Sequence, residues 1–128
     1  MTARVPQARD VALNEMNFRG LAINTDETAI TLVASDSGIM FLQNYASATT
    51  YTLPAVATGA GKMFMFLNAN TAASTVITST TALIIGTTTA GAAKTTLTSI
   101  AVGDWGIIVG DGTNWFWFAS PTVWTITT

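Results

Sequence analysis

The pattern of apolar and polar positions along the chain is that of many short β-strands. Apolar and polar residues alternate over residues 28–33 and 49–53, and continuous apolar runs occupy residues 39–42 and 63–67. Alternation with a period of two is typical of half-buried strands, and short apolar runs are typical of buried ones. We therefore expect strands at Thr28–Val33, Ile39–Gln43, Thr49–Leu53, Lys62–Asn68, Ser74–Thr78, Ala82–Thr87, Thr95–Ile100, Gly106–Gly110, Trp115–Phe118 and Thr122–Thr127.

Turn-forming residues separate these runs. Asp36-Ser37-Gly38 and Gly59-Ala60-Gly61 each lie between apolar segments, and residues 87–93 have the composition of a loop. Asp111-Gly112 between two apolar runs is the strongest hairpin signal in the chain. About nine or ten strands, with turns every 8–12 residues or so, predict an all-β fold: a β-sandwich, a jelly-roll-like body or a small barrel. No repeat of fixed period is apparent.

Charged residues concentrate near the N-terminus. Eight of the twelve fall within residues 1–36, and all three arginines, Arg4, Arg9 and Arg19, precede the first predicted strand. We therefore divide the chain into an N-terminal arm, residues 1–25, with a short helix over 8–17, and a β-sandwich body, residues 26–128. The arm is either a frayed terminus or a segment that docks on a partner. Arginine suits docking because its guanidinium pairs bidentately with carboxylates.

Composition narrows the range of functions. The chain has 128 residues, enough for one domain, and 24 of them are threonine, which favours strands. The chain contains no cysteine and no histidine. Catalysis by a thiolate or an imidazole is therefore excluded, and so are the usual zinc sites. The net charge of −2 offers no field to attract nucleic acid, and no apolar run approaches the ~20 residues of a membrane helix. We expect no cofactor and no metal.

One segment fits an enzymatic motif. Asp36-Ser37-Gly38 has the residue types of an aspartic-protease turn, in which two chains contribute a carboxylate dyad, and Ile84-Ile85-Gly86 follows at a fitting distance. Ala34-Ser35 and Ile39, however, stand where that family has different residues. Asp-Ser-Gly is also an ordinary turn, because aspartate bonds its own backbone and glycine adopts positive φ. The homodimeric protease is therefore a remote alternative, and we predict that the protein is not an enzyme.

Large aromatic residues crowd the last quarter of the chain. In residues 115–118 successive rings point to opposite faces of the predicted strand, so both faces should be covered. A central core strand, a subunit interface and a carbohydrate platform all remain possible explanations. The candidate core or interface aromatics are Trp105, Trp115, Trp117 and Trp124.

The order of segments over residues 28–118 resembles a known type of domain. A Thr-rich strand is followed by Asp36-Ser37-Gly38, then by Tyr51-Thr52-Leu53-Pro54 and an aromatic strand at 64–68. The series closes with Ala101-Val102-Gly103-Asp104 and Asp111-Gly112-Thr113-Asn114-Trp115. This order is similar to that of small β-rich domains of tailed-phage virions, found in head-decoration (capsid cement) proteins and in head or tail fibres. Residues 1–25 match no part of it, and residues 123–127 extend beyond its usual end.

The resemblance implies a structural role in a bacteriophage virion. Such domains are usually homotrimers, and as cement proteins they sit on the outer capsid surface, bind the major capsid protein and stabilise the shell. The short chain favours a cement protein over a fibre. The alternative is a head-fibre or tail-fibre domain that binds a receptor or glycan. In either case we expect partners among the virion proteins, with no nucleic acid and no membrane, and candidate shell-binding residues Arg4, Arg9 and Arg19.

Overall fold

The computed structural model describes residues 18–71, 73–80, 83–85, 95–99, 101–119 and 124–127. Within this part of the chain, short strands are joined by turns and by two 3-10 helices, η2 (Ala34–Asp36) and η3 (Val56–Thr58). The all-β prediction is confirmed. The strands are β1 (Gly20–Asn24), β2 (Ala29–Thr31), β3 (Ile39–Gln43), β4 (Thr49–Thr52), β5 (Met63–Asn68), β6 (Thr75–Thr78), β7 (Leu83–Ile85), β8 (Thr96–Thr98), β9 (Trp105–Gly110), β10 (Trp115–Ala119) and β11 (Thr125–Thr127).

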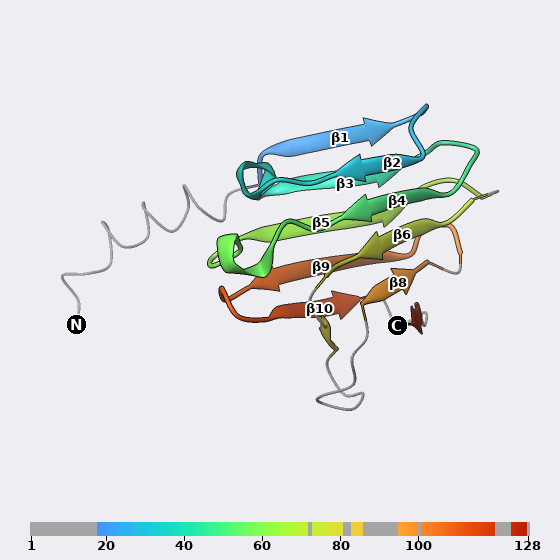
Figure 1. Cartoon of the computed structure of the whole chain (residues 1–128). Coiled ribbons are helices and arrows are strands. Elements are labelled where there is room, and N and C mark those ends of the chain that lie inside the picture. The colour runs from blue at the N-terminus through green and yellow to red at the C-terminus, as the bar shows by residue number, and fades with distance from the viewer. Residues whose placement is uncertain are drawn as a thin grey trace, which may run out of the picture.

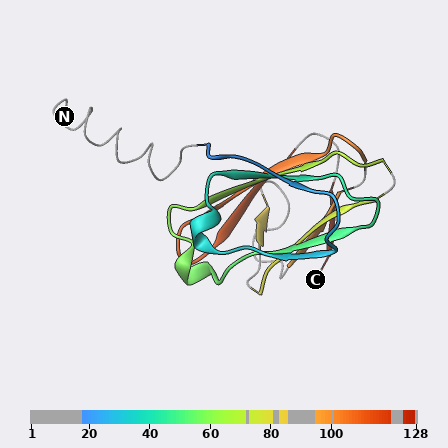
Figure 2. The same ribbon diagram turned by 90° about the horizontal axis from the view of Figure 1, so that it is seen from above.

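The strands form two sheets that face each other as the layers of a sandwich (Figures 1 and 2). Sheet A has six strands in the order β1-β3-β5-β9-β10-β7, and sheet B has five in the order β11-β8-β6-β4-β2. Burial alternates along the central strands, as in β5, where Phe64, Phe66 and Asn68 are buried and the residues between them are not. Each sheet therefore has one face toward the core and one face outward.

The first six strands alternate between the two sheets, so the chain winds as a short two-sheet solenoid. Strands β1, β3 and β5 are parallel neighbours in sheet A, as are β2, β4 and β6 in sheet B. Paired residues lie 19 and then 25 positions apart in sheet A, and 21 and then 26 apart in sheet B. Because the connections lengthen from one coil to the next, the sequence shows no fixed period. Parallel neighbours also distinguish these coils from an antiparallel jelly roll.

The chain after β6 completes both sheets mainly with antiparallel strands. Strand β8 pairs with β6 and β11 with β8, while β9 pairs with β5 and β7 lies parallel to β10 at the edge of sheet A. Strands β9 and β10 form the hairpin predicted from Asp111-Gly112. Gly112 has φ of 92°, a left-handed conformation that glycine adopts without steric cost.

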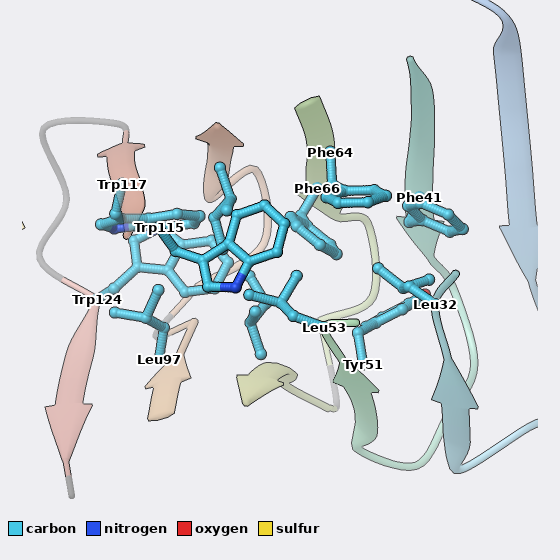
Figure 3. Packing of buried hydrophobic residues seen from close by; sticks show 12 residues of the cluster. Leu32, Phe41, Tyr51, Leu53, Phe64, Phe66, Leu97, Trp115, Trp117 and Trp124 are labelled. Carbon is cyan, nitrogen blue, oxygen red and sulfur yellow. The ribbon is translucent and has the colours of Figure 1, made fainter. Parts of the chain in front are cut away.

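An aromatic-rich core fills the space between the sheets (Figure 3). The rings of Trp117 and Trp124 meet edge to face with centroids 4.9 Å apart, so the C-terminal segment is packed into the body. A Cβ added at Gly106 would overlap the Trp117 ring, and glycine is therefore needed where β9 passes beneath it. The buried apolar residues are Leu32, Phe41, Tyr51, Leu53, Phe64, Phe66, Ile77, Leu97, Ile108, Trp115, Trp117 and Trp124.

The structure changes two of the predictions. Residues 20–24, which the sequence pattern assigned to the arm, form strand β1 and pair with β3, so the body begins earlier than residue 26. Strand β10 is not covered on both faces in a single chain: Trp115 and Trp117 point into the core, but Phe118 is 57% exposed. The expected helix over 8–17 and the expected loop over 87–93 lie outside the described residues.

Candidate interaction faces

Charge is absent from every strand of the described chain. The two outer faces of the sandwich are therefore neutral, and they differ only in the polarity of their uncharged side chains. The charged residues lie in the segments that connect or flank the strands: Arg19, Asp26, Glu27, Asp36, Lys62, Asp104 and Asp111.

The outer face of sheet A is apolar across five strands, β1, β3, β5, β9 and β10. The strand register aligns its outward side chains in three rows across the sheet. Apart from the indole nitrogen of Trp105, these side chains contain no nitrogen or oxygen. We call these twelve residues the apolar face. Its rows are Ile23-Leu42-Leu67-Trp105, Leu21-Met40-Met65-Ile107-Phe118 and Met63-Val109-Phe116.

Several residues of the apolar face are open to solvent in the single chain. Leu21 is 54% exposed, Ile23 60%, Trp105 44% and Phe118 57%. Scattered exposed apolar residues are common, but a continuous exposed patch of this kind usually marks an interaction site. The apolar face is therefore a candidate protein-binding surface.

The outer face of sheet B has the opposite character, although the strand geometry is the same. Its outward side chains align in two rows across five strands, and eight of the ten are threonine. The β-branched side chain suits a strand, and the hydroxyl can be hydrated without a charge. We call these ten residues the threonine face. Its rows are Thr125-Thr98-Val76-Thr50-Ala29 and Thr127-Thr96-Thr78-Thr52-Thr31.

A buried row of amides crosses one end of the solenoid, and the sequence analysis did not predict it. Asn24, Gln43 and Asn68 are the last residues of β1, β3 and β5, and they are aligned with one another. All three are at most 6% exposed. The available signal was that each residue ends an apolar run, but only the strand register shows that the three share one row.

The amide row holds the corners where the chain crosses between the sheets. Asn24 Nδ2 donates to Thr49 Oγ1 at 2.8 Å and to Gln43 Oε1 at 3.3 Å. Gln43 Nε2 donates to the carbonyl of Ser47 at 2.9 Å, and its Oε1 accepts from the Tyr45 N–H at 3.0 Å. These partners are backbone groups and neighbouring side chains of the same corners. The row therefore fixes the loops rather than opening toward a ligand.

Of the three candidate arm arginines, the structure describes only Arg19. Its N–H donates to the carbonyl of Gly38 at 2.8 Å, and its guanidinium donates to the carbonyls of Ser35 and Ser37. Arg19 thus anchors the start of β1 to the turn after η2. Arg4 and Arg9 lie outside the described residues.

The candidate tryptophans divide between the two sides of sheet A. Trp115 and Trp117 are buried inside the sandwich, as is Trp124, which follows in the C-terminal segment. Trp105 is on the outside, in the apolar face. Core packing therefore accounts for three of the four residues. Trp105 is exposed, so the interface and the carbohydrate platform stay open for it.

Two aspartates stabilise turns. Asp36 accepts a hydrogen bond from the Val33 N–H at 2.9 Å, and Ser37 Oγ accepts from the Met63 N–H at 2.9 Å, so the Asp36-Ser37-Gly38 segment closes a tight turn. Asp111 accepts from the N–H groups of Asn114 and Thr113 in the β9–β10 hairpin. These backbone hydrogen bonds lower the pKa of Asp111 below its usual value.

A small hollow lies at the open end of the first coil. Its volume is about 210 Å³, and its rim carries the acidic residues Asp26 and Glu27. In the described part of the chain there is no group of three or more acidic, histidine or cysteine residues that could hold a metal ion. The same part contains no helix with the length and apolarity needed to span a membrane. The hollow is lined by Ala22, Ile23, Asn24, Asp26, Glu27, Ile30 and Phe41.

The chain matches no protein-family model and has no significant match among curated proteins.

Proposed function

We propose that this chain is a structural virion protein, a capsid cement protein that binds the outer shell of a bacteriophage capsid as a homotrimer. The major capsid protein would be its partner on the shell. In this role the protein would catalyse no reaction. It would act through the binding free energy of its contacts with other proteins.

The observation that carries the proposal is the absence of charge from the strands of the described body. Soluble domains that face only water usually carry charged residues on about 25–35% of their surface. Here both sheet faces are neutral, and one of them is apolar across five strands. Such an apolar face suits a protein that is partly covered by other proteins. The resemblance of residues 28–118 to decoration and fibre domains supplies the virion context.

The mechanism would be mass action. A subunit that binds the assembled shell but not its separated parts stabilises the shell by RT ln(1 + [L]/Kd) per site, about 2.7 kcal/mol when the free subunit is at 100 times its Kd. Summed over many sites, these contributions would make the shell harder to open. The body described here would supply a rigid unit, and the preceding arm would supply part of the contact with the shell.

Imaging of capsids assembled with and without this chain tests the proposal. We expect added density on the outer shell, with three copies grouped at local three-fold positions. Density confined to a projecting fibre or to the tail would contradict the cement role and favour the fibre alternative. Shells with no added density at saturating protein would contradict both.

A further inference from the structure

We propose that the apolar face of sheet A is the subunit interface, covered by other copies of this chain. The inference deepens the proposed function by naming the surface through which copies meet. It rests on that function only for the number of copies, three.

The two outer faces of the sandwich differ in polarity although their strand geometry is the same. Both belong to sheets of the same sandwich, and both lack charge. If a charge-poor composition alone explained the apolar face, the outer face of sheet B should be equally apolar. Instead, eight of its ten outward positions carry a hydroxyl, while twelve of twelve positions on sheet A are apolar. One outer face therefore presents hydroxyl groups that water can hydrate, and the other presents only apolar side chains.

The character of the apolar face identifies a second copy as the occupant. Interfaces of partners that also exist apart are about as polar as the rest of a protein surface, whereas permanent homo-oligomeric interfaces are more apolar. A face made of twelve apolar side chains needs its cover from the time the chain folds. Other copies of the same chain are the partner always present at that moment.

The size of the face agrees with this assignment. Five strands about 4.8 Å apart, with outward residues about 6.7 Å apart along each strand, give a footprint of about 500 Å². Three such faces in a trimer together bury about 1,500 Å², above the roughly 1,000 Å² expected at least for a specific interface. In a trimer the three apolar faces would surround the three-fold axis, so that each face packs against both neighbours in a shared apolar interior.

The test is the mass of the full chain and of matched lysine variants by light scattering at micromolar concentration. Met65→Lys places a charge at the centre of the apolar face, between Met40 and Ile107. Thr52→Lys is the control, because it places the same charge between Thr31 and Thr78 on the threonine face. We expect about three times 13.4 kDa for the unmodified chain and for Thr52→Lys. For Met65→Lys we expect 13.4 kDa, with association weakened at least about a hundredfold.

A second variant guards against misfolding of Met65→Lys. Leu21→Lys combined with Ile23→Lys changes two residues that are more than half exposed on the edge strand β1, so the core is untouched. We expect this variant to give native circular dichroism and monomeric mass. The inference would be overturned if the unmodified chain were a monomer or if the lysine variants of the apolar face stayed assembled. It would also be overturned if only Thr52→Lys dissociated the chain. A dimer that Met65→Lys dissociates would support the interface and contradict the trimer of the proposed function.

Discussion

Tyr51 places a phenol hydroxyl in the core where no hydrogen bond of normal geometry reaches it from the described residues, although the Asn24 amide is near enough to oppose part of the rise in its pKa. The side chain is fully buried between Phe41 and Phe66, whose rings lie within 5.6 Å of its own. Burial of this group disfavours the phenolate and raises the pKa of Tyr51 from 10 to about 12. The residue contributes apolar area through its ring, while its hydroxyl opposes folding.

Tyr51→Phe should therefore stabilise the fold by about 1 kcal/mol at pH 7, because an unsatisfied buried hydroxyl costs about 1–3 kcal/mol. The effect should also depend on pH. Because burial disfavours the phenolate and raises the pKa of Tyr51, this group leaves stability unchanged below pH 10 and lowers it as the pH rises toward 12. Urea unfolding at pH 7 and pH 11 should show the unmodified chain losing more stability than Tyr51→Phe. A variant less stable than the unmodified chain at pH 7 would reveal a hydrogen bond to the hydroxyl.

At the scale of elements, the buried amide row determines how the solenoid turns its corners. Gln43 is fully buried, and it bonds to both backbone groups of Tyr45 and to the carbonyl of Ser47. A leucine at this position has a similar volume but no polar atom. The partly buried backbone groups of Tyr45 and Ser47 would then lose their side-chain partner, and the buried Asn24 amide would lose one of its acceptors.

Gln43→Leu should lower the free energy of unfolding by about 1–3 kcal/mol, because it removes several side-chain hydrogen bonds that hold a partly buried corner. Denaturant unfolding of the full chain measures the loss. Asn44→Leu is the matched control, since it removes the adjacent but exposed amide, and we expect it to change stability by less than about 0.5 kcal/mol. Equal effects of the two substitutions would show that the amide row does not stabilise the corners.

The strands that the sequence predicts well are those whose pattern is strong and local. Residues 39–43 form a strand with the predicted bounds, and the hairpin around Asp111-Gly112 follows from its turn chemistry. Strand β1 was missed because the charges before and after it suggested an arm, whereas its pairing partner β3 lies nearly twenty residues away. The local sequence pattern of a segment contains no information about its pairing with a strand so far along the chain.

The two outer faces could not be predicted for a similar reason. Every residue of 63–67 is apolar, so periodicity cannot decide whether Phe64 or Met65 points inward. The register with β9 and β3 decides it, because it places Phe64 beside buried Ile108 and Met65 beside Ile107 on the outside. The apolar face is a property of five strands brought together, and no single segment reveals it.

At the scale of the whole molecule, we propose different contacts for different parts of the chain. The apolar face would join copies, the threonine face would remain hydrated, and the arm before Phe18 would bind the shell. These contacts should respond differently to salt. Ionic strength screens exposed charge contacts made by Arg4 and Arg9, but it leaves apolar burial intact.

The proposed shell binding is tested most directly by co-sedimentation of this protein with undecorated bacteriophage capsids. The full chain should saturate the shell, and binding should weaken as salt rises. Deletion of residues 1–17 keeps Arg19 and all of β1. It should leave the proposed trimer intact but weaken binding about tenfold, because it removes the exposed charge contacts of Arg4 and Arg9, each worth up to about 1 kcal/mol. Equal occupancy of the full and shortened chains would move the attachment site to the body. Failure of the full chain to sediment with shells at any salt concentration would contradict the account.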